Sequence, residues 1–201
     1  MIRKFKLLGL ATVAVLAMSA FVASAASATN FTASTYPTSG TAFSEKGNDD
    51  IKTEAGSIEC RVHFHIDPIS GWNPKITVTP TFTECRAFGF LNATVNTNGC
   101  DFEWSVWGGF RIRCSFGKAM VVTAGTCEIT IGEQGELNKV DLANSGNGVS
   151  AQATVTGIAY TVTKDGFGCP FGGTGAKTGA TYTQNSPVLI SSNNGAKIDI
   201  G

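Results

Sequence analysis

Apolar and polar residues alternate along most of the chain after residue 28, and a period of two predicts β-strands. The clearest run spans residues 58–66, where alternate positions form one apolar face (Ile58, Cys60, Val62, Phe64 and Ile66). The intervening positions are charged or polar, so one face is predicted to be buried and the other solvated. No stretch after residue 28 keeps an apolar period of 3.6 residues. The sequence therefore predicts an all-β protein.

Turn residues divide this pattern into hairpins. Asp67-Pro68 and the segment 71–74 end the first strand, so residues 75–82 are expected to return antiparallel beside it. Asn98-Gly99 is typical of a type I′ turn and predicts a second hairpin, which would place Val95 opposite Phe102.

The next hairpin is decided by parity, because a shift of one residue exchanges the two faces of a strand. A two-residue Gly108-Gly109 turn would place Trp104 opposite Arg113. A loop of residues 105–109 instead gives pairs that match in character: Trp104 with Phe110, Phe102 with Ile112, Glu103 with Arg111, Asp101 with Arg113, and Cys100 with Cys114. This register is preferred and predicts a disulfide between Cys100 and Cys114.

All six cysteines lie after residue 28, and an even number in an exported chain indicates three disulfides. With Cys100 and Cys114 joined, the expected partners are Cys60 with Cys85 and Cys127 with Cys169. Cys85 falls on the polar face of its strand, so a bulge or strand end near Thr83-Glu84 is needed. The cysteines lack the close C-x-x-C pairs of zinc sites.

The pattern also predicts strands in the remaining segments. A bulge is expected at Thr156-Gly157, because the apolar residues switch there from one set of alternate positions to the other. About ten strands are expected in one domain. The predicted fold is a single antiparallel β-sandwich or barrel-like domain with three disulfides, and the pattern does not choose between those two arrangements.

The first 28 residues have the organisation of a secretory signal peptide. Arg3, Lys4 and Lys6 precede an apolar stretch, and A-x-A patterns predict cleavage after Ala25 or Ala28. Residues 29–201 would then be a secreted domain, extracellular or in the cell envelope, with no stable membrane anchor. Its 12 Lys and Arg against 15 Asp and Glu give a mildly acidic surface without a basic run, which argues against nucleic acid as a partner.

The segment from Arg86 to Cys100 contains Ala87-Phe88-Gly89-Phe90 followed by Asn96-Thr97-Asn98-Gly99-Cys100. It resembles a family of secreted, cysteine-containing all-β bacterial proteins, mainly actinobacterial, for which no activity is known. The likeness extends loosely from about Phe31 to Tyr182. It implies the fold, export and a bacterial origin, and it implies no site. His63, His65, Trp104 and Trp107 depart from this resemblance, so any function that rests on them is particular to this chain.

His63 and His65 are the candidate metal ligands, since residues two apart on a strand point to the same side. Arg61 shares that face and would repel a cation, and the chain has no other histidine. The alternative is that both histidines are solvated side chains on a polar face and bind no metal. No catalytic residue and no cofactor are predicted, because neither G-x-S-x-G nor H-E-x-x-H occurs.

Trp107 and Trp72 are the candidate binding residues, because aromatic side chains in loops can stack on sugars or anchor a partner protein. The alternative for Trp107 is that its ring folds back over the edge of the core. The sequence thus favours a secreted, non-enzymatic domain that acts by surface contact with an extracellular protein or glycan. A small secreted enzyme or metal-binding protein using His63 and His65 is the second interpretation.

Overall fold

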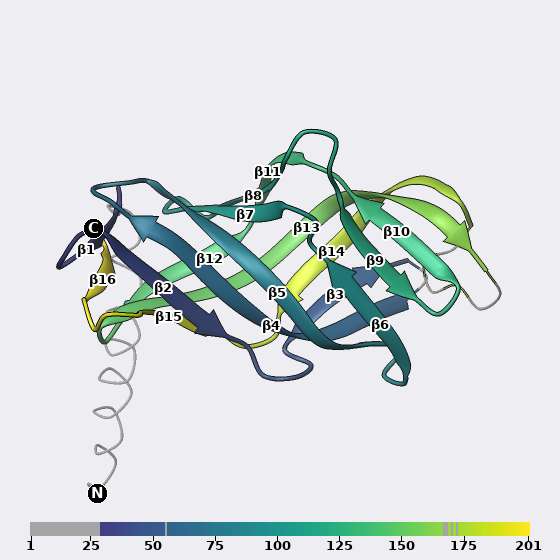
Figure 1. The fold of residues 1–201 in the computed structure, drawn as a ribbon, viewed down its shortest axis with the longest axis horizontal. Coiled ribbons are helices and arrows are strands. Elements are labelled where there is room, and N and C mark those ends of the chain that lie inside the picture. The colour runs from purple at the N-terminus through teal and green to yellow at the C-terminus, as the bar shows by residue number, and fades with distance from the viewer. Residues whose placement is uncertain (1–28, 55, 167–168, 170, 172) are drawn as a thin grey trace, which may run out of the picture.

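The computed structural model describes residues 29–201 except 55, 167–168, 170 and 172, so the predicted signal peptide lies outside the described residues. The described residues form an antiparallel all-β fold without helices, as the alternation predicted (Figure 1). More strands form than the ten expected: β1 (Phe31–Ala33), β2 (Thr38–Phe43), β3 (Asp49–Thr53), β4 (Gly56–Ile69), β5 (Lys75–Ala87), β6 (Leu91–Asn96), β7 (Cys100–Ser105), β8 (Gly109–Cys114), β9 (Met120–Ala124), β10 (Cys127–Ile131), β11 (Gln134–Asn138), β12 (Val140–Ser145), β13 (Gly148–Asp165), β14 (Gly175–Gln184), β15 (Val188–Ser192) and β16 (Ile198–Ile200).

Within these same ranges, no helix has the length and apolar character needed to cross a membrane.

The strand pairing closes on itself. The sequence left a sandwich and a barrel-like arrangement open, and the structure has the closed one of these two. The circuit runs from β4 through β5, β6, β9, β10, β13, β14 and β3 back to β4. A second path of paired strands shares β4, β5 and β13, adds β15, β2, β7 and β8, and ends at β11, which does not pair with β13 through its backbone. The side-chain amide of Gln134 joins β11 to β13, donating to Ala159 O at 2.9 Å and accepting from Ala159 N at 2.8 Å.

The long strands β4 and β5 confirm the predicted first hairpin. Ile66 pairs with Val78 and Arg61 with Thr83, but Glu59 pairs with Arg86, so one extra residue lies on β5. That residue falls at the predicted bulge, where Glu84 adopts a φ of 52°. The bulge restores the parity of the two cysteines, and Cys60 and Cys85 form a disulfide.

The register chosen for the β7–β8 hairpin is confirmed throughout, from Cys100 with Cys114 to Trp104 with Phe110. Cys100 is bonded to Cys114, and the remaining pair, Cys127 and Cys169, is also joined. The bulge expected at Thr156-Gly157 is present as a register shift between Val155 and Ile158, with Gly157 at a φ of 77°.

The predicted pairing of Val95 with Phe102 across the Asn98-Gly99 turn is wrong. The turn itself forms, with Cys100 N donating to Thr97 O at 2.9 Å. The two strands then diverge: β6 pairs with β9, where Val95 faces Val122, and β7 pairs with β5, where Phe102 faces Val78. The Asn98-Gly99 residues thus determine the turn, but both strands that leave it pair with other strands of the sheet.

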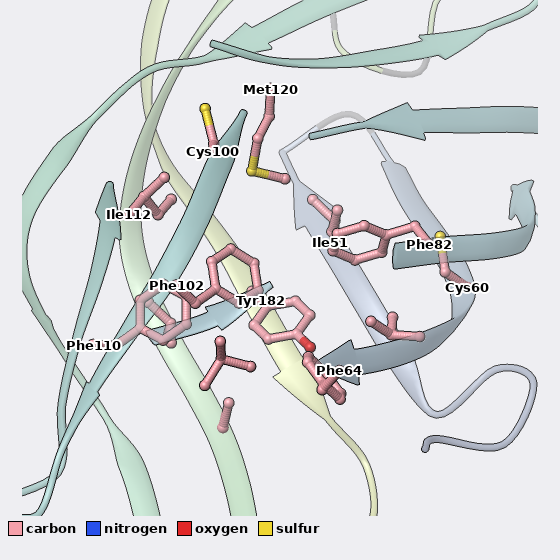
Figure 2. Close-up of a cluster of buried hydrophobic side chains, with 14 of the residues drawn as sticks. Ile51, Cys60, Phe64, Phe82, Cys100, Phe102, Phe110, Ile112, Met120 and Tyr182 are labelled. Carbon is pink, nitrogen blue, oxygen red and sulfur yellow. The ribbon is translucent and has the colours of Figure 1, made fainter. Parts of the chain in front are cut away.

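The core contains a cluster of aromatic rings between the strands (Figure 2). The Phe102 ring lies 4.7 Å from that of Phe110, 5.8 Å from Tyr182 and 6.5 Å from Phe82, measured between centroids. Trp104 is fully buried nearby, 5.7 Å from Phe64. These contacts hold β7 and β8 against β5 and β14, and so fix the loops at the ends of β5 and β7.

Candidate binding site

His63 and His65 lie on the exposed face of β4, as their parity predicted. His63 pairs with Phe43 on one side and Thr81 on the other. Its ring contacts the Phe43 ring edge-on, with 3.9 Å between the ring centroids. Among the described residues, no three His, Cys, Asp or Glu side chains are grouped to hold a metal ion. Metal binding by His63 and His65 therefore stays a prediction, and it needs at least one further ligand besides these two side chains.

Trp72 and Trp107 are both strongly exposed, at 78% and 67% of their surface. Trp107 thus does not fold back over the core. Trp72 belongs to the β4–β5 loop and Trp107 to the β7–β8 turn, and these two connections lie side by side because Lys75 pairs with Ser105. Val106 N donates to Pro74 O at 2.9 Å, which ties the loops together. The fold brings together two tryptophans that are far apart in the sequence.

Backbone hydrogen bonds hold the Trp72 loop in place. Asn73, the next residue, exchanges hydrogen bonds with Phe31 of β1, from Phe31 N to Asn73 O at 2.6 Å and from Asn73 N to Phe31 O at 3.3 Å. The Asn73 side chain also accepts from Lys75 N at 3.1 Å. The loop is consequently anchored directly after the exposed indole.

The Trp107 turn is anchored in the same way. Gly108 N donates to Ser105 O at 2.9 Å, and Gly109 N donates to the buried Ser105 hydroxyl at 2.8 Å. Gly108 O accepts from Val140 N of β12 at 2.9 Å. Since the bound and free backbones would then be similar, little ordering is required when a ligand contacts Trp107.

Tyr36 is a third exposed aromatic residue at this end, and the sequence did not single it out. It lies in the β1–β2 loop, 42% exposed, where its hydroxyl accepts a hydrogen bond from Ala33 N at 3.1 Å. Thr38 pairs with Ile69, so this loop and the β4–β5 loop leave the sheet at the same end. We call Tyr36, Trp72 and Trp107 the aromatic end. The β1–β2 and β4–β5 loops, which carry the first two, lie at the end of the fold near β1 and the C-terminus in Figure 1.

The positive charges near the aromatic end are paired. Lys139 and Asp141, which flank the Val140 that bonds to the Trp107 turn, form an ion pair at 3.5 Å. On the strands that lead to the two loops, the Glu103 carboxylate forms ion pairs with Lys75 at 2.8 Å and with Arg113 at 3.4 Å. The hydrogen bond from Lys75 is the largest cause of a lowered pKa at Glu103. The surroundings of the tryptophans are therefore polar and carry no excess of positive charge.

A second pair of exposed aromatic side chains occupies the β5–β6 turn. Phe88 and Phe90 are 42% and 75% exposed, and their rings stack at 6.4 Å between centroids. Phe88 and Gly89 have φ values of 53° and 77°, nearly those of Asn98 and Gly99 in the β6–β7 turn (50° and 78°). Asparagine tolerates this left-handed region, whereas a phenylalanine there is strained.

We expect the substitution Phe88→Asn to raise the free energy of unfolding by about 1 kcal/mol, because it gives the β5–β6 turn the residue that the β6–β7 turn already uses. Urea denaturation of the variant and the wild type measures the difference. Asn98→Phe is the reciprocal change and is expected to destabilise by a similar amount. A destabilised Phe88→Asn variant would show that the phenyl ring contributes more to folding than its backbone strain costs.

Buried polar groups form a cluster in the wall of the first circuit. Asp49 is buried and hydrogen-bonded to the hydroxyl of Tyr182, and Gln184 accepts from Ala153 N at 2.8 Å. Burial raises the pKa of the Asp49 carboxyl, while hydrogen bonds from Ser44, Tyr182 and Gln184 oppose that rise. Tyr182 also borders an apolar cavity of about 20 Å³, which is too small for a ligand beyond the size of water.

A wider groove of about 460 Å³ lies over β10, β13 and β14, between Thr130, Tyr160 and Lys177. Neither His63, His65 nor the tryptophans line it. The sequence-predicted residues are thus divided between an open strand face and the aromatic end, and only the two tryptophans are brought together from separate segments. In comparisons with protein families, curated proteins and solved structures, the chain matches none.

Proposed function

We propose that this protein is an exported, non-enzymatic binding domain that contacts its target through the aromatic end. The observation that carries this proposal is the exposure of two tryptophans on adjacent, anchored loops. An exposed aromatic side chain on a rigid loop is suited to recognition, since it offers a large contact area at a small entropic cost.

The third tryptophan supports this interpretation by contrast. Trp104 is completely buried, although it lies only three residues before Trp107. Leaving a large apolar side chain in water forgoes roughly 1.5–3 kcal/mol of burial. Folding alone therefore gives no reason for Trp72 and Trp107 to be exposed together, whereas contact with a partner does.

Three disulfides join the described cysteines, and such a set is typical of proteins that fold in an oxidising compartment. Together with the signal peptide predicted in the first 28 residues, they support a location outside the cytoplasm, in the envelope or beyond it. The target is accordingly expected among the molecules of that compartment.

The proposal predicts that the wild-type mature protein co-sediments with insoluble envelope material of the producing cell and that Trp72→Ala/Trp107→Ala reduces this retention at least about tenfold, as expected for aromatic hot spots. The matched control is Phe116→Ala, which removes another fully exposed aromatic ring, in the β8–β9 loop at the far end of β8 from Trp107. All three proteins should unfold at similar temperatures. Equal retention of the double variant, or no retention of the wild type, would refute the proposed function.

A further inference from the structure

We infer that the target of the aromatic end is a neutral glycan, an inference that rests on the proposed function and gives its ligand a chemical class. The aromatic end combines exposed rings with uncharged or charge-balanced polar groups, and pyranose sugars require both features. Their apolar faces stack on indole rings, while their hydroxyls exchange hydrogen bonds with the side chains around them.

The size of the apolar surface separates a glycan from a protein partner. A stable protein interface buries about 800 Å² on each side and has an apolar centre surrounded by a polar rim. At the aromatic end, the large exposed hydrophobic side chains among the described residues are Tyr36, Trp72 and Trp107 alone. Two polar residues lie close by: Asn73 follows Trp72 and is bonded to Phe31 of β1, and Asn30 precedes Phe31. Separate rings within a polar surface fit the alternating apolar and hydroxyl faces of a sugar chain better than a continuous protein patch.

The charge distribution separates a neutral from an anionic glycan. Anionic polymers are bound by clusters of unpaired Lys and Arg. Here Lys139 is paired with Asp141, and Lys75 and Arg113 both contact Glu103. Lys75 and Lys139, which lie beside the tryptophan loops, already face carboxylates, and Arg113 lies toward the other end of the β7–β8 hairpin. The aromatic end therefore offers no cluster of free positive charge among its described side chains.

The position of the two loops indicates that one sugar chain can meet both indoles. Trp72 and Trp107 lie three and two residues beyond the paired residues Lys75 and Ser105. Paired strands are separated by about 5 Å. The two loops consequently share one short stretch of surface, and their anchored backbones keep the spacing between them fixed. An oligosaccharide of several units is the expected ligand, with Trp72 and Trp107 contributing separate stacking positions.

The direct test is a titration of the mature protein with hexasaccharides of β-1,4-linked glucose, xylose, mannose and N-acetylglucosamine, with polygalacturonate as the anionic comparison. Tryptophan fluorescence and calorimetry report binding. The expected result is saturable binding of at least one neutral chain, with a shift in the emission of exposed tryptophans and no binding of polygalacturonate. Trp72→Ala and Trp107→Ala should each weaken the affinity about 10- to 30-fold. Phe88→Asn/Phe90→Ala, which removes the other exposed ring pair, should leave it unchanged.

Envelope material treated in two ways makes the outcome decisive when the natural sugar differs from these probes. Periodate cleaves sugars with vicinal diols, and a hydrolase of β-1,4-linked N-acetylglucosamine cleaves the chains that lack such diols. One of these two treatments should abolish tryptophan-dependent retention, and digestion with protease should not. Retention that survives both glycan-cleaving treatments but is lost to protease would overturn the glycan inference and leave the proposed binding function standing. If the tryptophan variants do not affect retention at all, the binding function itself fails. Binding of polygalacturonate in preference to the neutral chains would overturn the neutral class.

Discussion

Replacing Phe102 with alanine is expected to lower the free energy of unfolding by about 3–5 kcal/mol, among the largest effects of any single substitution in this chain. Phe102 is only 3% exposed and contacts three aromatic rings, those of Phe82, Phe110 and Tyr182. The substitution removes the ring of β7 from the shared interior, so both the burial of that ring and the packing of its neighbours are lost. Urea denaturation followed by tryptophan fluorescence measures the loss.

Phe116→Ala is the matched control for this prediction, because it removes the same ring from a fully exposed position in the β8–β9 loop. Its effect is expected to stay within about 0.5 kcal/mol. A Phe102→Ala variant as stable as Phe116→Ala would mean that the aromatic cluster does not hold β7 in place. The position of Trp107, which follows β7 directly, would then have no structural support.

The alternation of residues was sufficient to predict the buried and solvated faces of β4 and the register of β7 with β8. Both depend on parity, and a wrong parity would have placed Arg113 opposite the buried Trp104. The same reasoning located the bulge beside Glu84 without any knowledge of the fold. Wherever one face of a strand must be buried, a sequence therefore carries strong information on pairing between neighbours in the chain.

Pairing between strands that are not neighbours was beyond this reasoning. Asn98-Gly99 determined a tight turn but not the partners of the strands it joins, because Val95 and Phe102 find other apolar strands in β9 and β5. An apolar face is satisfied equally by any apolar face of matching length, so local sequence cannot choose between them. The closure of the sheet into a circuit follows from those choices and was for that reason left open.

The candidate site was predictable only in part for the same reason. Loop tryptophans could be singled out as Trp72 and Trp107, but their proximity depends on the pairing of Lys75 with Ser105. Tyr36 was missed because its place depends on β2 lying beside β4. Exposure of a ring is likewise decided by tertiary packing, as Trp104 and Trp107 demonstrate within one hairpin.

Removing the Cys100–Cys114 disulfide by the double substitution Cys100→Ser/Cys114→Ser is expected to cost about 2–4 kcal/mol. This bridge joins paired residues of β7 and β8 across 14 positions and so restricts the unfolded chain. It also closes the end of the hairpin opposite the Trp107 turn. The loss should appear as a lower melting temperature, with the strand content of the far-ultraviolet spectrum retained below the transition.

The wild type under reducing conditions is the comparison for this variant, since all three bridges are then open and the loss of stability should be larger. Thermal unfolding with and without reductant orders the three samples. If the double serine variant melts with the oxidised wild type, the bridge contributes nothing beyond the packing of its two strands. If it melts with the fully reduced protein, Cys60–Cys85 and Cys127–Cys169 add nothing to stability, and the hairpin that carries Trp107 is the part of the fold on which the rest depends.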